Sequence, residues 1–199
     1  MSRDIVFLYD QVIESMARLH AFDAVKIHDW PDPTNDVEDD LDDFAEIMAR
    51  RDLLTFAASA RNFAEACEAA GEMRAVTAAT CKLLSPPKSP FFIETPETIT
   101  LYQVLSRLLH STKIRICKYS DDYHELLTSI DAFLQLAGNR QGQVIERSET
   151  LVIIQSEKEP FTAVRLRSLL LKACDFLNAV SDRLSAENKI FLQRSYREL

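Results

Sequence analysis

The residues best suited to chemistry are a histidine and three cations near the middle of the chain. The stretch LYQVLSRLLHSTKIRICK, residues 101–118, holds Arg107, His110, Lys113 and Arg115. Imidazole titrates near neutral pH, and guanidinium and ammonium groups bind phosphate oxygens. The cluster therefore fits a phosphate-binding site or a site of RNA cleavage. The alternative is structural and more common, because cations near a helix C-terminus interact with the free carbonyl groups there.

Sequence motifs for other kinds of catalysis are absent. The four histidines show no H-E-x-x-H spacing, and the chain has no G-x-S-x-G nucleophile elbow. The four cysteines are far apart and form no C-x-x-C pair, which favours reduced, buried thiols over a zinc site or a disulfide framework. We therefore expect no metal and no cofactor, and a non-catalytic role is favoured over an enzyme.

An acidic run at residues 36–43 is the second feature with a functional interpretation. Carboxylates at the start of a helix are favoured by its free amide groups and its dipole. A cation site is the less favoured interpretation, because an EF-hand needs a glycine at its sixth position and the first glycine of the chain is Gly71. The run also fits an acidic surface that blocks a basic partner protein.

The bulk composition limits the partners. The formal net charge of the 199-residue chain is −8, which disfavours non-specific binding to RNA and to anionic membranes. No apolar run is long enough to span a bilayer, and Asp4 and Asp10 come too early for a signal-peptide core. We therefore expect a cytoplasmic protein without a membrane partner, and RNA as a disfavoured partner.

Apolar spacings of three and four predict helices over much of the chain. They are expected over residues 2–20, 36–71, 72–84, 121–138 and 161–184, with a further helix capped by Thr95 and a last one from Ser185. Only three glycines and seven prolines occur, which fits long helices. Alternating or β-branched runs predict short strands at residues 113–119, 144–147 and 151–155. We expect a mainly α fold: one helical domain over residues 1–199, a helical bundle with a small two- or three-stranded β element near residues 113–155.

Three stretches carry a family resemblance. TLYQVLSRLLHSTKIRI resembles the helix-to-strand step of a loose group of bacterial proteins that are similar to the HEPN superfamily of helical domains. LVIIQSEKEPFTAVRLRSLLLKACDFL is similar to their ending, and ARNFAEAC to their second long helix. Together these stretches cover less than half of the chain. The resemblance implies a helical bundle, frequent dimerisation and, in active members, metal-independent RNA cleavage in toxin–antitoxin or phage-defence systems.

The sequence departs from the active-site motif of that superfamily. The motif is an arginine followed on the same helix, about four to six residues later, by a histidine, whereas only two residues separate Arg107 from His110. Residues three apart still share a helix face, so binding fits better than cleavage. We expect a non-catalytic binding or assembly module, a homodimer or a protein partner, and a degenerate HEPN-like domain. The alternatives are an RNA-binding protein or ribonuclease using Arg107, His110, Lys113 and Arg115, and an acidic inhibitor of a basic protein.

Overall fold

The computed structural model describes residues 3–24, 36–84, 91–118, 150–155 and 162–186. Within these ranges only the backbone is described at residues 3, 36–43, 81–84, 91–96 and 117–118. The helix expected over residues 121–138, the strand expected over residues 144–147 and the helix expected after Ser185 lie largely or wholly outside the described residues.

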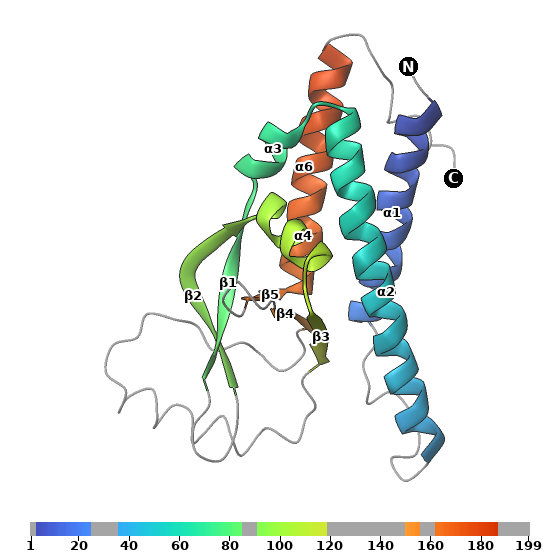
Figure 1. Ribbon diagram of the computed structural model, residues 1–199, viewed down its shortest axis with the longest axis vertical. Coiled ribbons are helices and arrows are strands. Elements are labelled where there is room, and N and C mark those ends of the chain that lie inside the picture. The colour runs from blue at the N-terminus through green and yellow to red at the C-terminus, as the bar shows by residue number, and fades with distance from the viewer. Residues whose placement is uncertain (1–2, 25–35, 85–90, 119–149, 156–161, 187–199) are drawn as a thin grey trace.

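Three long helices form the body of the molecule (Figure 1). They are α1 (Arg3–Ala24), α2 (Asp36–Ala66) and α6 (Leu166–Ala186), and α1 packs against both of the others. The stripe predicted for α1 is confirmed, because Val12, Met16 and Leu19 are buried and the rest of it packs against them. The stripe predicted for α6 is also confirmed, since all its members are buried: Leu166, Leu169, Leu170, Ala173, Leu177, Val180 and Leu184.

The second long helix ends earlier than Gly71, the predicted stop. It ends at Ala66, and Gly71 lies inside the next helix, α3 (Ala70–Ala75). The chain reverses through Glu68, which has a left-handed φ of 53°. The amide of Ala69 closes the turn with a 2.7 Å hydrogen bond to the carbonyl of Ala64. A glycine is therefore not needed to end this helix.

A five-stranded antiparallel sheet lies beside the helices. Its strands are β1 (Thr77–Leu84), β2 (Phe91–Thr100), β3 (Lys113–Lys118), β4 (Thr150–Gln155) and β5 (Thr162–Arg165), in the order β2-β1-β5-β4-β3. The fold class is thus mainly helical with a small β element, as expected, and β3 and β4 form within the expected region. The sheet also takes in β1, β2 and β5, which the sequence did not predict.

Two of the predicted helices are wrong in part, because residues 77–84 and 91–100 form the β1–β2 hairpin, while residues 72–75 and 101–109 are helical. Residues 77–84 pair along their length with residues 91–100, so their backbone hydrogen bonds are made in the sheet. Thr95 and Pro96 resemble a helix start, but both lie in β2, next to the register shift between Ala79 and Cys81. Proline is tolerated at such irregularities and on edge strands. The helix begins only at Leu101.

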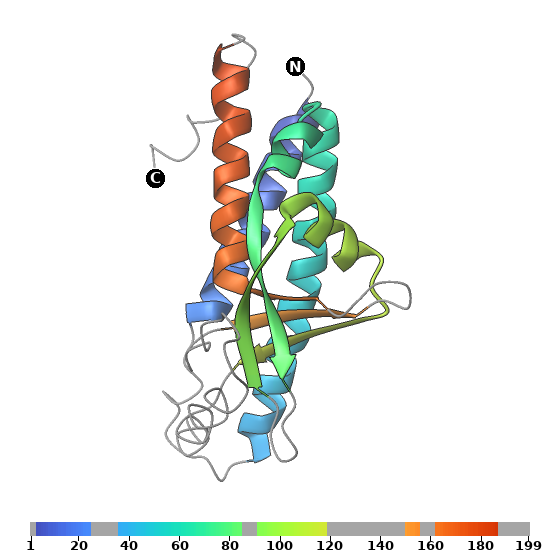
Figure 2. The same ribbon diagram turned by 90° about the vertical axis from the view of Figure 1, so that its left-hand side faces the viewer.

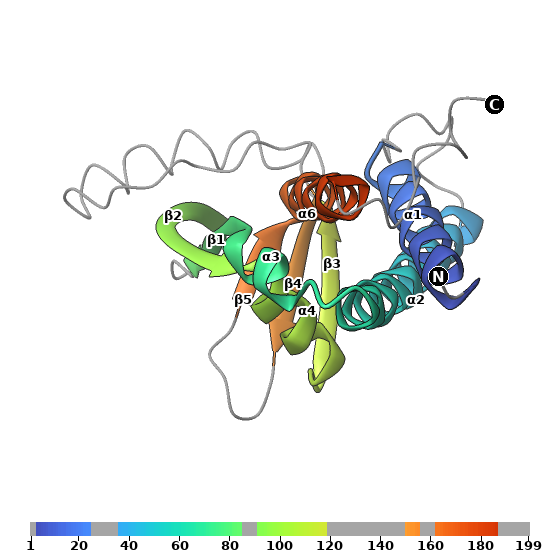
Figure 3. The same cartoon turned by 90° about the horizontal axis from the view of Figure 1, so that it is seen from above.

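The sheet shares its core with the helices. Ile116, Val152 and Val164 form one row across β3, β4 and β5, and all three are buried. Seen from above, α2 lies next to β3, and α6 lies next to β4 and β5 (Figure 3). The β1–β2 hairpin lies beside α3 and α6 (Figure 2). The short helix that carries the predicted site packs against α2 and α3 and also contacts β2 and α6, which fixes its position.

Candidate functional site

The helix that carries the predicted site is α4 (Leu101–Leu109), and its start is well defined. The amide of Gln103 donates to Thr100 Oγ1 at 3.1 Å, and the amide of Thr100 donates to Gln103 Oε1 at 3.0 Å. This reciprocal pair is a capping box, which satisfies two amide groups that a helix start leaves free. The buried residues of α4 are Leu101, Val104, Leu105 and Leu108. Its polar side chains are exposed or partly buried at the edge of the core.

Arg107 is partly buried and turned toward the sheet. Its Nη1 donates a hydrogen bond to the Oγ1 of Thr162, a residue of β5 that is itself buried. Thr162 pairs with Ile154 of β4, so Arg107 reaches across the ends of these strands. The guanidinium therefore joins α4 to the sheet through a hydroxyl of β5, a contact that the sequence did not predict.

His110 follows the last residue of α4 and is exposed. Its amide donates to the carbonyl of Ser106 at 3.1 Å, and its imidazole makes no hydrogen bond to the part of the chain that the structure describes. The carbonyl of Leu108 accepts instead from Ser111 Oγ, at 2.9 Å. The side chain of His110 is thus not used to close the helix end.

Lys113 and Arg115 lie on the exposed face of β3. They are exposed, whereas Ile114 is partly buried and Ile116 is buried, so the alternation predicted for this strand is confirmed. The strand pairs in antiparallel register with β4, with Lys113 opposite Gln155 and Arg115 opposite Ile153. The structure therefore places His110, Lys113 and Arg115 at the surface, while Arg107 is turned inward to β5.

A second polar cluster escaped prediction from the sequence. Arg61 of α2 was expected to pair with acids of the preceding helix or to face solvent. Its Nη2 instead donates to the hydroxyl of Tyr102 in α4 at 3.2 Å and lies 3.6 Å from Glu65 Oε1. Arg74 of α3 lies over the same tyrosine ring. The sequence offered no reason to expect a functional role for Tyr102, because its spacing groups it with the apolar residues of α4.

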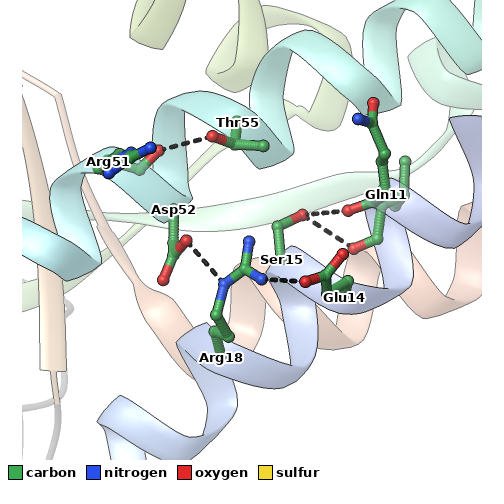
Figure 4. A network of polar contacts seen from close by, with 8 residues as sticks. Gln11, Glu14, Ser15, Arg18, Arg51, Asp52 and Thr55 are labelled. Atoms are coloured by element: carbon green, nitrogen blue, oxygen red, sulfur yellow. Dashed lines mark hydrogen bonds and ion pairs between the residues drawn. The ribbon is translucent and has the colours of Figure 1, made fainter.

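A polar network also joins α1 to α2 (Figure 4). Arg18 Nε donates to Asp52 Oδ1 at 2.8 Å, and the same guanidinium pairs with Glu14 one turn earlier. The hydrogen bond that Arg18 donates to Asp52 is the main cause that raises the pKa of Arg18. Ser15, buried between the helices, donates to the carbonyls of Gln11 and Val12 at 2.8 and 3.0 Å. All these groups have partners, so this network is structural.

The N-terminal half of α2 carries apolar side chains on two opposite sides. Ala49, Leu53 and Phe56 are buried against the rest of the molecule. The outer face of α2 consists of Phe44, Ile47, Met48 and Leu54, which are 60%, 51%, 37% and 41% exposed. The helical pattern predicted for residues 36–71 included members of both sets, Phe44 and Leu54 on the outer face and Phe56 on the buried one, without distinguishing them. The acidic side chains at residues 36–43, on which the inhibitor hypothesis rests, lie outside the described side chains.

The two cysteines whose side chains are described differ in exposure. Cys67 is buried, as expected, and burial raises the pKa of its thiol to about 11. Cys174 is exposed, so the prediction that it is a buried core residue is wrong. The described residues contain no group of three potential metal ligands, and no described helix is long and apolar enough to cross a membrane.

Comparisons with known proteins gave no match: no family model fits the chain, and no curated protein and no solved structure is significantly similar to it. The HEPN-like resemblance therefore stays a prediction, and the functional argument rests on the chain's own residues.

Proposed function

We propose that this protein is a non-catalytic binding and assembly module that forms a homodimer through the outer face of α2. The observation that carries the proposal is the exposure of Phe44, Ile47, Met48 and Leu54 opposite the buried face of the same helix. A helix that is apolar on both sides is usually covered on both sides. Contiguous exposed apolar side chains commonly mark protein–protein contacts.

The order of charges along α2 supports a second copy of the chain as the partner. Residues 36–43 include six acids, and Arg50 and Arg51 follow about two turns later. In a two-fold symmetric interface the same patch contacts itself. Two α2 helices packed antiparallel about an axis near Ile47 bring the acidic turns of one beside the arginines of the other. The resemblance to HEPN domains, which frequently dimerise, agrees with this arrangement.

Sedimentation velocity tests the proposal. We expect the wild-type protein to sediment as a dimer at micromolar concentration and the Phe44→Ser/Ile47→Ser variant as a monomer. Leu171→Ser is the matched control, because Leu171 is also an exposed apolar residue, 58% exposed, but lies on α6. A wild-type protein that stays monomeric at high micromolar concentration, or a control that dissociates equally, contradicts the proposal.

RNA binding is a second candidate function, favoured by the distribution of charge around β3. Residues 98–118, 150–155 and 162–165 contain no Asp or Glu, although the whole chain is acidic. His110, Lys113 and Arg115 are exposed within this region. Exposed cations within a stretch of described residues that has no acids are suited to phosphate contacts, and such binding weakens as the salt concentration rises.

Fluorescence anisotropy with a labelled single-stranded RNA tests this second candidate. We expect Arg115→Ala and His110→Ala to weaken binding and Arg115→Ala to reduce its salt dependence. Arg167→Ala is the matched control, because Arg167 is an exposed arginine of α6, outside this region. An equal loss of RNA affinity in Arg167→Ala, or no RNA binding by the wild type, contradicts the proposed RNA-binding site.

A further inference from the structure

Three helices bring two arginines onto one tyrosine. The Cζ atom of Arg61, from α2, lies 4.2 Å from the centroid of the Tyr102 ring, and that of Arg74, from α3, lies 4.5 Å from it. Tyr102 belongs to α4, whose start is fixed by the capping box. Arg61 is held more tightly than Arg74, because its guanidinium also donates to the tyrosine hydroxyl and its side chain is only 18% exposed. The clamp, defined as Arg61, Arg74 and Tyr102, is thus built on three packed elements.

The clamp carries more positive charge than the carboxylates among the described side chains neutralise. Two guanidiniums close to one ring repel each other, and the ring's electrons offset this only in part. The carboxylate of Glu65, which pairs with Arg61, is 3.6 Å away and 66% exposed, so solvent weakens the pair. Arg74 is exposed and makes no hydrogen bond or ion pair to the described residues. The acid closest to it in sequence, Glu72, is 2.5 Å from Arg183 instead.

The donors of the clamp also exceed its acceptors. A guanidinium has five N–H donors, and a phenol that accepts one hydrogen bond still has its own proton to donate. Arg61 uses one donor on Tyr102, and among the described residues Arg74 uses none. These remaining donors belong to two guanidiniums that lie within 4.5 Å of the centroid of one tyrosine ring and to the hydroxyl of that ring.

We propose that Arg61, Arg74 and Tyr102 bind a phosphate group. A phosphate group has several acceptor oxygens and is negatively charged, once as a backbone diester and about twice as a monoester, so it can accept from both guanidiniums and offset their positive charge. A metal cation is excluded by the charge of the clamp. A nucleic-acid base is disfavoured, because the ring on which it would stack is already covered by the arginines. The phosphate can belong to a small phosphorylated molecule or to a nucleic-acid backbone.

Isothermal titration of the full chain tests the clamp, with sodium phosphate, adenosine monophosphate and a short oligouridylate as probes at matched ionic strength. We expect saturable phosphate binding that Arg74→Ala weakens by about tenfold or more, the size of one charge-assisted bidentate contact. Arg74→Lys keeps the charge but loses the planar fork and gives a smaller loss. Arg167→Ala, which removes an exposed arginine from α6, leaves binding unchanged.

The three probes distinguish the source of the phosphate. Tighter binding of the monophosphate than of the oligouridylate, per phosphate site, indicates a small ligand, and the reverse order indicates a nucleic-acid backbone. Wild-type protein without saturable binding of any probe overturns the proposal, as does an equal loss in Arg167→Ala. Because Arg74 is exposed, Arg74→Ala is expected to stay folded. If it instead lowers the melting temperature while the wild type binds no phosphate, the clamp only holds the helices together.

Discussion

Arg183 of α6 donates a hydrogen bond from Nη2 to the carbonyl oxygen of Cys67 at 2.6 Å. Its Nε lies 2.5 Å from Glu72 Oε1 in α3. One side chain therefore binds the turn between α2 and α3, where Glu68 has a left-handed backbone. Carbonyls at a helix end need hydrogen-bond donors of this kind, and a left-handed non-glycine residue persists only when its surroundings hold it.

We expect Arg183→Ala to lower the free energy of unfolding by about 2 kcal/mol, the contribution of a hydrogen bond to a charged group in a partly exposed site. Urea denaturation measures the change. Arg167→Ala on the same helix serves as the control, since Arg167 is exposed, and it should change stability by less than about 0.5 kcal/mol. If the two variants are equally stable, Arg183 does not hold the turn.

The two sides of α2 should respond differently to truncation. Phe63 is buried, and its ring centroid lies 5.8 Å from that of Tyr9 in α1 and 6.2 Å from that of Phe176 in α6. Phe63→Ala should therefore cost about 3–5 kcal/mol, through lost burial and the cavity left behind.

Phe44→Ala is the control on the same helix, because Phe44 is 60% exposed. Measured at a concentration where the wild type is monomeric, this variant should change the free energy of unfolding by less than about 0.5 kcal/mol. A large loss in Phe44→Ala under those conditions shows that the outer face of α2 packs within the chain and not against a second copy.

The capping box of α4 makes a separate prediction. Thr100→Ala removes the acceptor of the Gln103 amide and should cost about 1 kcal/mol in the free energy of unfolding. Thr98→Ala is the control, because Thr98 is exposed and two residues away in the same strand. Thermal or urea unfolding followed by circular dichroism measures both variants. Equal losses would mean that strand propensity, and not the cap, is affected.

The Cys67 thiol should make stability depend on pH in the alkaline range. Burial raises its pKa from 9.0 to about 11 in the folded chain. Below pH 9 the thiol is protonated in both the folded and the unfolded state, so it has no effect. Between pH 9 and 11 the unfolded state loses the proton first, which favours unfolding.

The free energy of unfolding of the wild type should therefore fall more steeply from pH 9 to 11 than that of Cys67→Ala, by about 1–2 kcal/mol. The comparison with the variant cancels the titration of tyrosines and lysines, which ionise in the same range. Parallel pH profiles for the two proteins would show that Cys67 titrates normally in the folded state.

The long helices could be predicted from the sequence, because their buried residues recur at spacings that only a helix places on one face. Val12, Met16 and Leu19 are an example in α1, and the stripe of α6 is another. Strand β3 could be predicted because Ile114 and Ile116 alternate with cations. Local periodicity is sufficient to predict a helix or a strand where one face of the element is buried and the other is solvated.

The hairpin and the clamp could not be predicted in this way. Residues 77–84 contain alanine, lysine and leucine, which also suit a helix, so their pairing with β2 decides their structure. Thr95 and Pro96 carry a local signal for a helix start that the sheet overrides. Arg61, Arg74 and Tyr102 come from three separate elements, and their meeting depends on how α2, α3 and α4 pack, which no sequence spacing records.

The order of strands in the sheet has a consequence for how the chain folds during its synthesis. Strand β5 has only four residues and comes late in the sequence, yet it lies between β1 and β4 and joins the two parts of the sheet. As the chain emerges from the ribosome, the α1–α2 pair and the β1–β2 hairpin can form from contacts close in sequence. The sheet stays in two pieces until residues 162–165 have been synthesised. Because joining them requires contacts between distant parts of the chain, closure of the sheet should be the slow, late step of folding.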